Sequence, residues 1–134
     1  MRPNILYKNF SYSDILTKFI SEELDFRLDY EALKSQKIDE QFVEILFFRP
    51  HSFLRNKEII FECRLEAVLP WRSERISATC QDRRFWQALR RSLSLLIKQM
   101  NLEIQKYRAK ARDINSKQDF KWILEHWEYG QYEH

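Results

Sequence analysis

The segment 83–112 constrains the fold most, because it reads as one long helix with two unlike sides. Apolar residues recur in it every three or four positions, the spacing that gives a helix one face toward a core; they are Phe85, Leu89, Leu93, Leu96, Met100, Ile104 and Tyr107. At about 100° per residue, most of its basic residues fall on the side away from this face. Such a helix must pack its apolar side on another layer of structure.

The same segment concentrates the positive charge of the chain. It holds nine basic residues and one acidic residue, Glu103, so its charge is +8; since the whole chain is +3, the other residues sum to −5. The basic residues are Arg83, Arg84, Arg90, Arg91, Lys98, Lys106, Arg108, Lys110 and Arg112. Arginines on a helix are often a solubilising face balanced by glutamates four residues away, but here those acids are missing. The pattern therefore predicts a partner that carries phosphates.

The rest of the chain predicts strands and one further helix. Ser13 is a suitable N-cap for a helix over residues 14–27, where apolar residues keep helical spacing. Residues 58–69 alternate with period two over their whole length, which predicts a strand; its core face is expected to hold Ile59, Phe61, Cys63, Leu65, Ala67 and Leu69. Shorter strands are predicted over residues 5–10, 41–48 and 75–80. Residues 29–40 are predicted to form a loop that has room for a helical turn. Residues 50–57 are predicted to form a turn.

This order of elements predicts an α+β fold. A strand, a helix, three strands and a second helix give a two-layer β-α-β-β-β-α domain over residues 1–112, with a four-stranded sheet and both helices on one face. Residues 113–134 form an acidic, aromatic tail. A sequence like a capping box, Ser116 with Asp119, begins a short third helix there. Its apolar stripe is expected to pack on the open face of the sheet or on a protein partner, and consists of Phe120, Ile123, Leu124 and Trp127.

Several classes of function lack the residues they need. The chain has one glycine, Gly130, which excludes glycine-rich phosphate loops. Its histidines have no partner at zinc-binding spacing, and its two cysteines, Cys63 and Cys80, have no CxxC spacing and read as reduced thiols. No segment has the length and apolarity of a membrane span. We therefore expect a cytoplasmic protein that is not an enzyme, with no catalytic residues, metal, cofactor, membrane contact or small-molecule substrate.

RNA is the phosphate carrier that these patterns favour. The sequence contains neither a helix-turn-helix nor a zinc finger, the usual means of placing a helix in the major groove of DNA. Helix-on-sheet domains commonly bind RNA, and we expect contacts to its backbone and shape rather than to base edges.

Two segments resemble a known family. Residues 4–20 contain Phe10-Ser11-Tyr12-Ser13-Asp14, and residues 76–100 contain Asp82, Phe85-Trp86-Gln87-Ala88-Leu89 and Lys98-Gln99-Met100. In order and spacing these are similar to the bacterial ribosome hibernation-promoting factors, also called ribosome-associated inhibitors or sigma-54 modulation proteins. The resemblance covers about residues 4–112. The chain looks like a short form, since it lacks the C-terminal dimerisation domain of the long form.

The resemblance implies a fold, a partner and an activity. Family members fold as β-α-β-β-β-α, bind the rRNA of the small ribosomal subunit near the mRNA and tRNA sites, and silence translation in stress or stationary phase without catalytic residues. Lys98 matches a family rRNA-binding position most clearly, and Lys106 matches a second basic position. The chain departs from the family at Glu22 and Glu23, where the family often carries lysines.

We therefore expect a translation inhibitor that binds small-subunit rRNA through the basic side of the 83–112 helix. Two alternatives remain: a protein-interaction module that uses the aromatic tail, and an RNA-binding domain that acts away from the ribosome.

Overall fold

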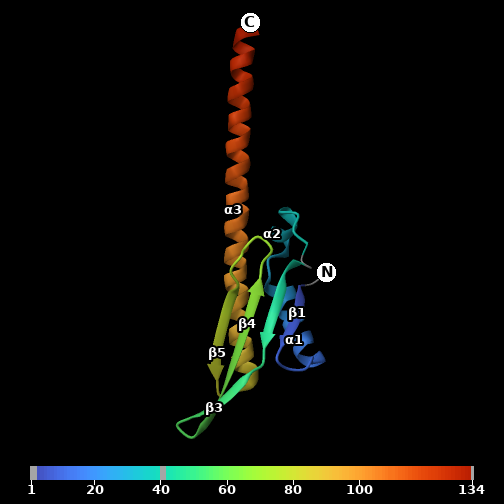
Figure 1. Ribbon diagram of the computed structural model, residues 1–134, viewed down its shortest axis with the longest axis vertical. Coiled ribbons are helices and arrows are strands. Elements are labelled where there is room, and N and C mark those ends of the chain that lie inside the picture. Colours follow the sequence, from blue (N-terminus) through green and yellow to red (C-terminus); the bar gives the residue numbers. More distant parts are fainter. Residues whose placement is uncertain (1–2, 40–41, 134) are drawn as a thin grey trace.

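The computed structural model describes residues 3–39 and 42–133, with side chains described as far as residue 110. It is a mixed α+β structure, as predicted. The elements in chain order are β1 (Asn4–Lys8), α1 (Asp14–Arg27), α2 (Tyr30–Ser35), β2 (Glu44–Phe48), β3 (His51–Arg55), β4 (Glu58–Val68), β5 (Ile76–Asp82) and α3 (Phe85–Glu133). Figure 1 shows one sheet with α3 running beside it and far past its end.

The sheet is mixed. β1 pairs in parallel with β2, and the remaining pairs, β2 with β4, β3 with β4 and β4 with β5, are antiparallel. β2 and β3 pair with successive parts of β4, because Phe47 lies opposite Leu65 and His51 lies opposite Glu62. The sheet thus has five strands rather than the predicted four, and β3 pairs along β4 next to β2.

The prediction of a turn over residues 50–57 is wrong for most of that segment. His51–Arg55 form β3, and the chain reverses at Asn56 and Lys57, whose φ angles are 50° and 66°. Two consecutive residues with positive φ are typical of the tight turns that join hairpin strands. Four of the five residues of β3 are exposed, so no apolar alternation marks it as a strand.

The core lies between the sheet and the helices. Its fully buried large side chains include Ile20 and Leu24 of α1, Ile45 and Phe47 of β2, Leu65 of β4, and Leu89, Leu93, Leu96 and Met100 of α3. Small residues on α3 complete its packing on β5: Ala88 is fully buried, and the buried Ser92 donates a hydrogen bond to the Ala78 carbonyl at 2.9 Å. The predicted stripe of the 83–112 helix is therefore the side that faces the core.

The predicted core face of β4 is buried along only part of the strand. Cys63, Leu65, Ala67 and Leu69 are buried as the alternation predicts. Ile59, however, is 57% exposed, whereas Ile60 on the other face is 7% exposed. In Figure 1 the β3–β4 hairpin extends beyond the rest of the sheet. The prediction for Ile59 is therefore wrong: period two fixes which residues share a face, but does not say where along the strand that face is covered.

The first helix has the predicted bounds. The Ser13 hydroxyl accepts a hydrogen bond from the Leu16 N–H at 3.3 Å and caps α1. The segment predicted as a loop over residues 29–40 contains the short helix α2, capped by Asp29, whose carboxylate accepts from the Ala32 N–H at 3.1 Å. Residue 40 lies outside the described residues.

The C-terminal helix corrects two predictions about the tail. α3 is one continuous helix to Glu133, rather than a helix ending at Arg112 followed by a separate short one. Its second half leads away from the sheet (Figure 1), so the tail does not cover the open sheet face. The side chains of the predicted stripe, Phe120, Ile123, Leu124 and Trp127, lie outside the described residues, and their partner-binding role stays a prediction.

Local side chains cover part of the open sheet face instead. Leu46, which points away from the helix side of β2, is 2% exposed. The Arg64 guanidinium lies over the Phe48 ring, 4.8 Å from its centre. Arg64 and Arg75 both bind the carboxylate of Glu66. This layer explains why β2 is apolar on both sides without a second helical layer.

Candidate nucleic-acid interface

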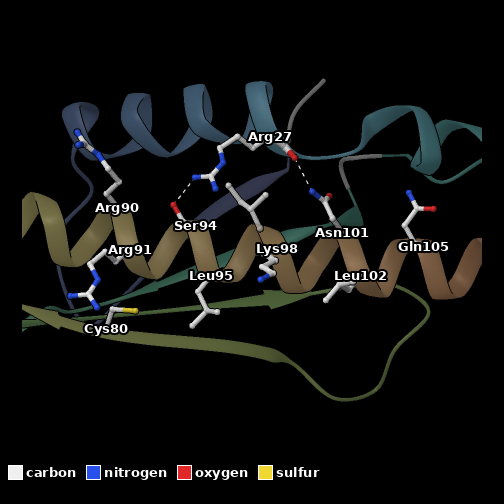
Figure 2. Close-up of a pocket in the computed structure, with 11 residues that line it drawn as sticks. Arg27, Cys80, Arg90, Arg91, Ser94, Leu95, Lys98, Asn101, Leu102 and Gln105 are labelled. Atoms are coloured by element: carbon white, nitrogen blue, oxygen red, sulfur yellow. Dashed lines mark hydrogen bonds between the residues drawn. The ribbon is translucent and has the colours of Figure 1, made fainter.

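A groove of about 810 Å³ runs along the exposed side of α3, between α1 and β5. Figure 2 shows α1 on one side of the helix and β5 on the other. Four cationic side chains line the groove: Arg27 from the end of α1, and Arg90, Arg91 and Lys98 from α3. None of the described residues lining the groove is acidic. The arrangement can therefore bind an anion without competition from a carboxylate within the groove.

The margin toward α1 is a polar seam that fixes α3 to the corner between α1 and α2. Arg27 Nη1 donates a hydrogen bond to Ser94 Oγ at 2.6 Å. Asn101 accepts from the Asp29 N–H at 2.9 Å and donates to the Arg27 carbonyl at 2.8 Å. Gln105 Nε2 donates to the Asp29 carboxylate at 2.5 Å. The amides and the hydroxyl on this side of α3 thus hold the neighbouring helices and satisfy the end of α1.

The margin toward β5 is less polar. Leu95 and Leu102 of α3 are 39% and 54% exposed, and the half-buried Cys80 of β5 also lines the groove. Figure 2 shows both leucine side chains directed toward the β5 side of the helix. The cations of α3 therefore lie between a hydrogen-bonded seam and an apolar border.

The four cations differ in whether an acidic residue of the chain forms an ion pair with them. Arg91 lies 3.3 Å from an Asp82 carboxylate oxygen and also donates to the Gln81 carbonyl at 3.2 Å. Arg27 lies 3.5 Å from Glu23. No ion pair of Arg90 or Lys98 occurs with any residue whose side chain is described, and both are exposed. The uncompensated charge of the groove therefore centres on these two residues.

The backbone and the arginine beside Asp82 lower its pKa. The hydrogen bond from the Arg84 N–H lowers the pKa of Asp82 below its ordinary value, and the hydrogen bond and charge of Arg91 lower it further. Asp82 accepts the Arg84 N–H at 3.0 Å immediately before α3 begins. Asp82 thus lies just outside the helix, where it contacts both the start of α3 and Arg91.

The remaining predicted RNA-binding residues do not line the groove. Arg83 forms an ion pair with Glu58 at 2.9 Å, and Lys106 forms one with Glu103 at 3.3 Å. Arg84 and Lys110 are exposed and Arg108 is half-buried, all away from the groove lining. The side chain of Arg112 lies outside the described residues. The structure thus gathers Arg90, Arg91 and Lys98 and leaves the other described residues of the prediction elsewhere.

Among the four cations of the groove, Arg27 is the one that the sequence did not predict as an RNA-binding residue. Its position at the end of a helix, four residues after Glu23, is typical of a local ion pair. Its contact with Ser94 joins residues 67 positions apart. No pattern within α1 indicates that contact, because it depends on how α1 and α3 pack against each other.

Within the described residues, no group of three or more histidine, cysteine, aspartate or glutamate side chains is placed to hold a metal ion. No helix among them combines the length and apolarity needed to cross a membrane.

Comparisons with known proteins give likenesses to solved structures only. No protein-family model and no curated protein matches the chain. A ribosomal subunit interface protein from Coxiella burnetii is similar at 16% identity and a TM-score of 0.42, covering 81% of this chain and 99% of its own. The Protein Y N-terminal domain from Thermus thermophilus is similar at 15% identity and a TM-score of 0.42, covering 75% and 97%.

Proposed function

We propose that this protein is a non-enzymatic translation inhibitor that binds the rRNA of the small ribosomal subunit. The observation that carries the proposal is the groove on α3, where Arg27, Arg90, Arg91 and Lys98 come together and no lining residue is acidic. In this proposal the protein occupies the region of the mRNA and tRNA sites and excludes those RNAs sterically.

The chemistry of the groove favours phosphates. Arginine presents a planar set of donors that suits phosphate oxygens, and lysine adds a compact charge. Arg90 and Lys98 lie about two helical turns apart on one side of α3, so an extended polyanion can contact both. Neutralising RNA phosphates releases their counterions, which makes the affinity strong at low salt and weak at high salt.

The ribosome as the source of these phosphates rests on the sequence resemblance. Lys98, the residue that matches a family rRNA-binding position most clearly, lies in the groove. Lys106, the second match, is paired with Glu103 outside the groove, so we give it no part in the proposed contact. Of α1 we include Arg27 alone, since Glu23 and the neighbouring Glu22 would repel a phosphate.

The proposal is tested by measuring binding to small subunits across salt concentrations. Arg90→Gln with Lys98→Gln removes the two uncompensated charges and keeps long polar side chains. The slope of log K against log salt is negative, and each lost phosphate contact makes it shallower by about 0.7 to 0.9. We expect co-sedimentation of the double variant to weaken and the magnitude of its slope to decrease by about 1.5.

The matched control is Lys34→Gln with Lys57→Gln, which removes two exposed charges outside the groove. It changes the net charge equally and should bind as the wild type does. Equal losses in both double variants would show that net charge alone drives the association, and unchanged binding of the groove variant would remove the groove from the function.

A further inference from the structure

The two cysteines face each other across neighbouring strands. Cys63 of β4 and Cys80 of β5 are direct partners in the antiparallel ladder, and both are free thiols. Directly opposed Cα atoms in such a ladder lie about 4.5 to 5.5 Å apart, within the span of about 4.4 to 6.8 Å that a disulfide bridges. Their Cβ atoms would have to approach by up to about 2 Å. The register therefore allows a disulfide without moving either strand along the other.

The two thiols differ in their access to solutes. Cys63 is fully buried in the core between the sheet and α3, whereas Cys80 is half-buried and lines the groove. Figure 2 shows Cys80 on β5 near Arg91. Burial above all, together with the nearby Cys80 and Glu62, raises the pKa of Cys63 to about 12. At neutral pH Cys63 is a protonated, enclosed thiol, so a dissolved oxidant meets Cys80 first.

We propose that Cys63 and Cys80 are a modification site, which a hydroperoxide converts to a cross-strand disulfide. The Cys80 sulfur attacks one oxygen of hydrogen peroxide, the O–O bond breaks, and the products are a sulfenic acid on Cys80 and water. The Cys63 sulfur then attacks the Cys80 sulfur and displaces hydroxide, which takes the Cys63 proton and leaves as a second water. Two electrons pass from the two thiols to the peroxide.

The disulfide would change the border of the groove. It would tie β4 to β5 beneath α3 and draw the Cys80 sulfur away from the groove surface toward the core. A reducing compartment keeps such pairs as thiols, so the disulfide marks exposure to an oxidant. The inference does not depend on the proposed RNA binding, since it concerns the thiols alone.

The test is peroxide treatment of the full-length, reduced protein, followed by intact mass measurement and peptide mapping without reductant. We expect the chain to lose two hydrogen atoms and to yield one cross-linked peptide pair that contains Cys63 and Cys80, reversed by a thiol reductant. Before oxidation, iodoacetamide should label Cys80 in the folded protein and Cys63 only after unfolding.

Two variants identify the order of the steps. In Cys63→Ala the sulfenic acid at Cys80 should persist long enough for dimedone to trap it, and in Cys80→Ala peroxide should leave Cys63 unchanged. If either variant fails to fold, the wild-type peptide map still decides. A wild-type protein that accumulates sulfenic or sulfinic acid at Cys80 while Cys63 stays a thiol would overturn the proposal, as would a product linked only between two chains.

Discussion

Glu66 is a carboxylate with little access to solvent on the sheet face opposite the helices. It is 5% exposed, and Arg64 and Arg75 both donate hydrogen bonds to it. Burial acts to raise the pKa of Glu66, but the hydrogen bonds and charges of the two arginines outweigh burial and hold it below its ordinary value. Both arginines remain about half exposed, so the network joins the interior of the sheet to its surface.

The lowered pKa makes the contribution of Glu66 dependent on pH. A carboxylate whose pKa is lower in the folded state stabilises the fold above its unfolded value of 4.5 and loses this effect as the pH falls through the folded value. We expect Glu66→Gln to have a smaller free energy of unfolding than the wild type at pH 7. The difference should shrink as the pH falls below 4.5.

Urea unfolding at a series of pH values measures this difference. Glu74→Gln is the control, because Glu74 is 85% exposed and 3.9 Å from Arg72, and exposed pairs of this kind contribute little. A difference for Glu66→Gln that stays constant from pH 7 to pH 3 would show that lost packing, not charge, causes it.

At the scale of elements, local sequence patterns predicted the bounds of α1 but did not predict the strand β3. The bounds of α1 follow from Ser13 and the apolar spacing, and both are local properties of the chain. β3 has no such signal, since it is mostly exposed. It pairs residue by residue with the start of β4, from His51 opposite Glu62 to Arg55 opposite Glu58. Its strand character therefore comes from its partner and from the turn that joins them.

The turn at Asn56 and Lys57 offers a test of this view. Both residues have positive φ, which costs a residue with a Cβ roughly 1 to 2 kcal/mol and glycine almost nothing. Asn-Gly is the pair that such turns favour. We expect Lys57→Gly to increase the free energy of unfolding by about 1 kcal/mol, since the relief of strain exceeds the added entropy of the unfolded chain.

Chemical denaturation of the variant measures the change. The same exchange in the interior of a helix, Lys18→Gly at an exposed position of α1, should instead destabilise by about 1 kcal/mol. A loss of stability in Lys57→Gly would mean that the hairpin does not close through this turn.

At the scale of the whole molecule, α3 belongs to two environments. Its first part packs on the sheet, and near the end of this packing Trp71 stacks on Tyr107 with ring centres 4.6 Å apart. Arg72 and Lys106 both reach Glu103 close by. Beyond this region the helix runs on away from the body (Figure 1). In proteins most of the stability of a helix comes from tertiary packing of its apolar face.

This arrangement predicts that the body folds without the tail. A chain ending at Arg112 should keep the cooperative unfolding transition of the full protein, with a stability change within about 0.5 kcal/mol, because the removed helix lies past the sheet. Thermal unfolding followed by circular dichroism checks this, and the helical signal should fall. Loss of the transition would show that residues 113–134 are part of the folded unit.

The same truncation separates the proposed function from its rival. If the groove binds RNA, the shortened chain should still sediment with small subunits, and any protein partner lost with residues 113–134 is an accessory. If the aromatic stripe is the binding element, as in a protein-interaction module, all association should disappear. A charge-reversed full-length variant, Arg90→Glu with Lys98→Glu, gives the opposite pattern in each case.

The sequence alone determined the class of the fold, the bounds of α1, the core side of α3 and the concentration of charge on its other side, because helical and strand periodicity are local properties of the chain. The tertiary structure decided which cations share one surface. Arg27 joins Arg90, Arg91 and Lys98 there, whereas Arg83 and Lys106 turn to acids of the chain. It also placed Cys63 opposite Cys80. These relations depend on packing between segments far apart in sequence, and the spacing of residues within one segment does not contain them.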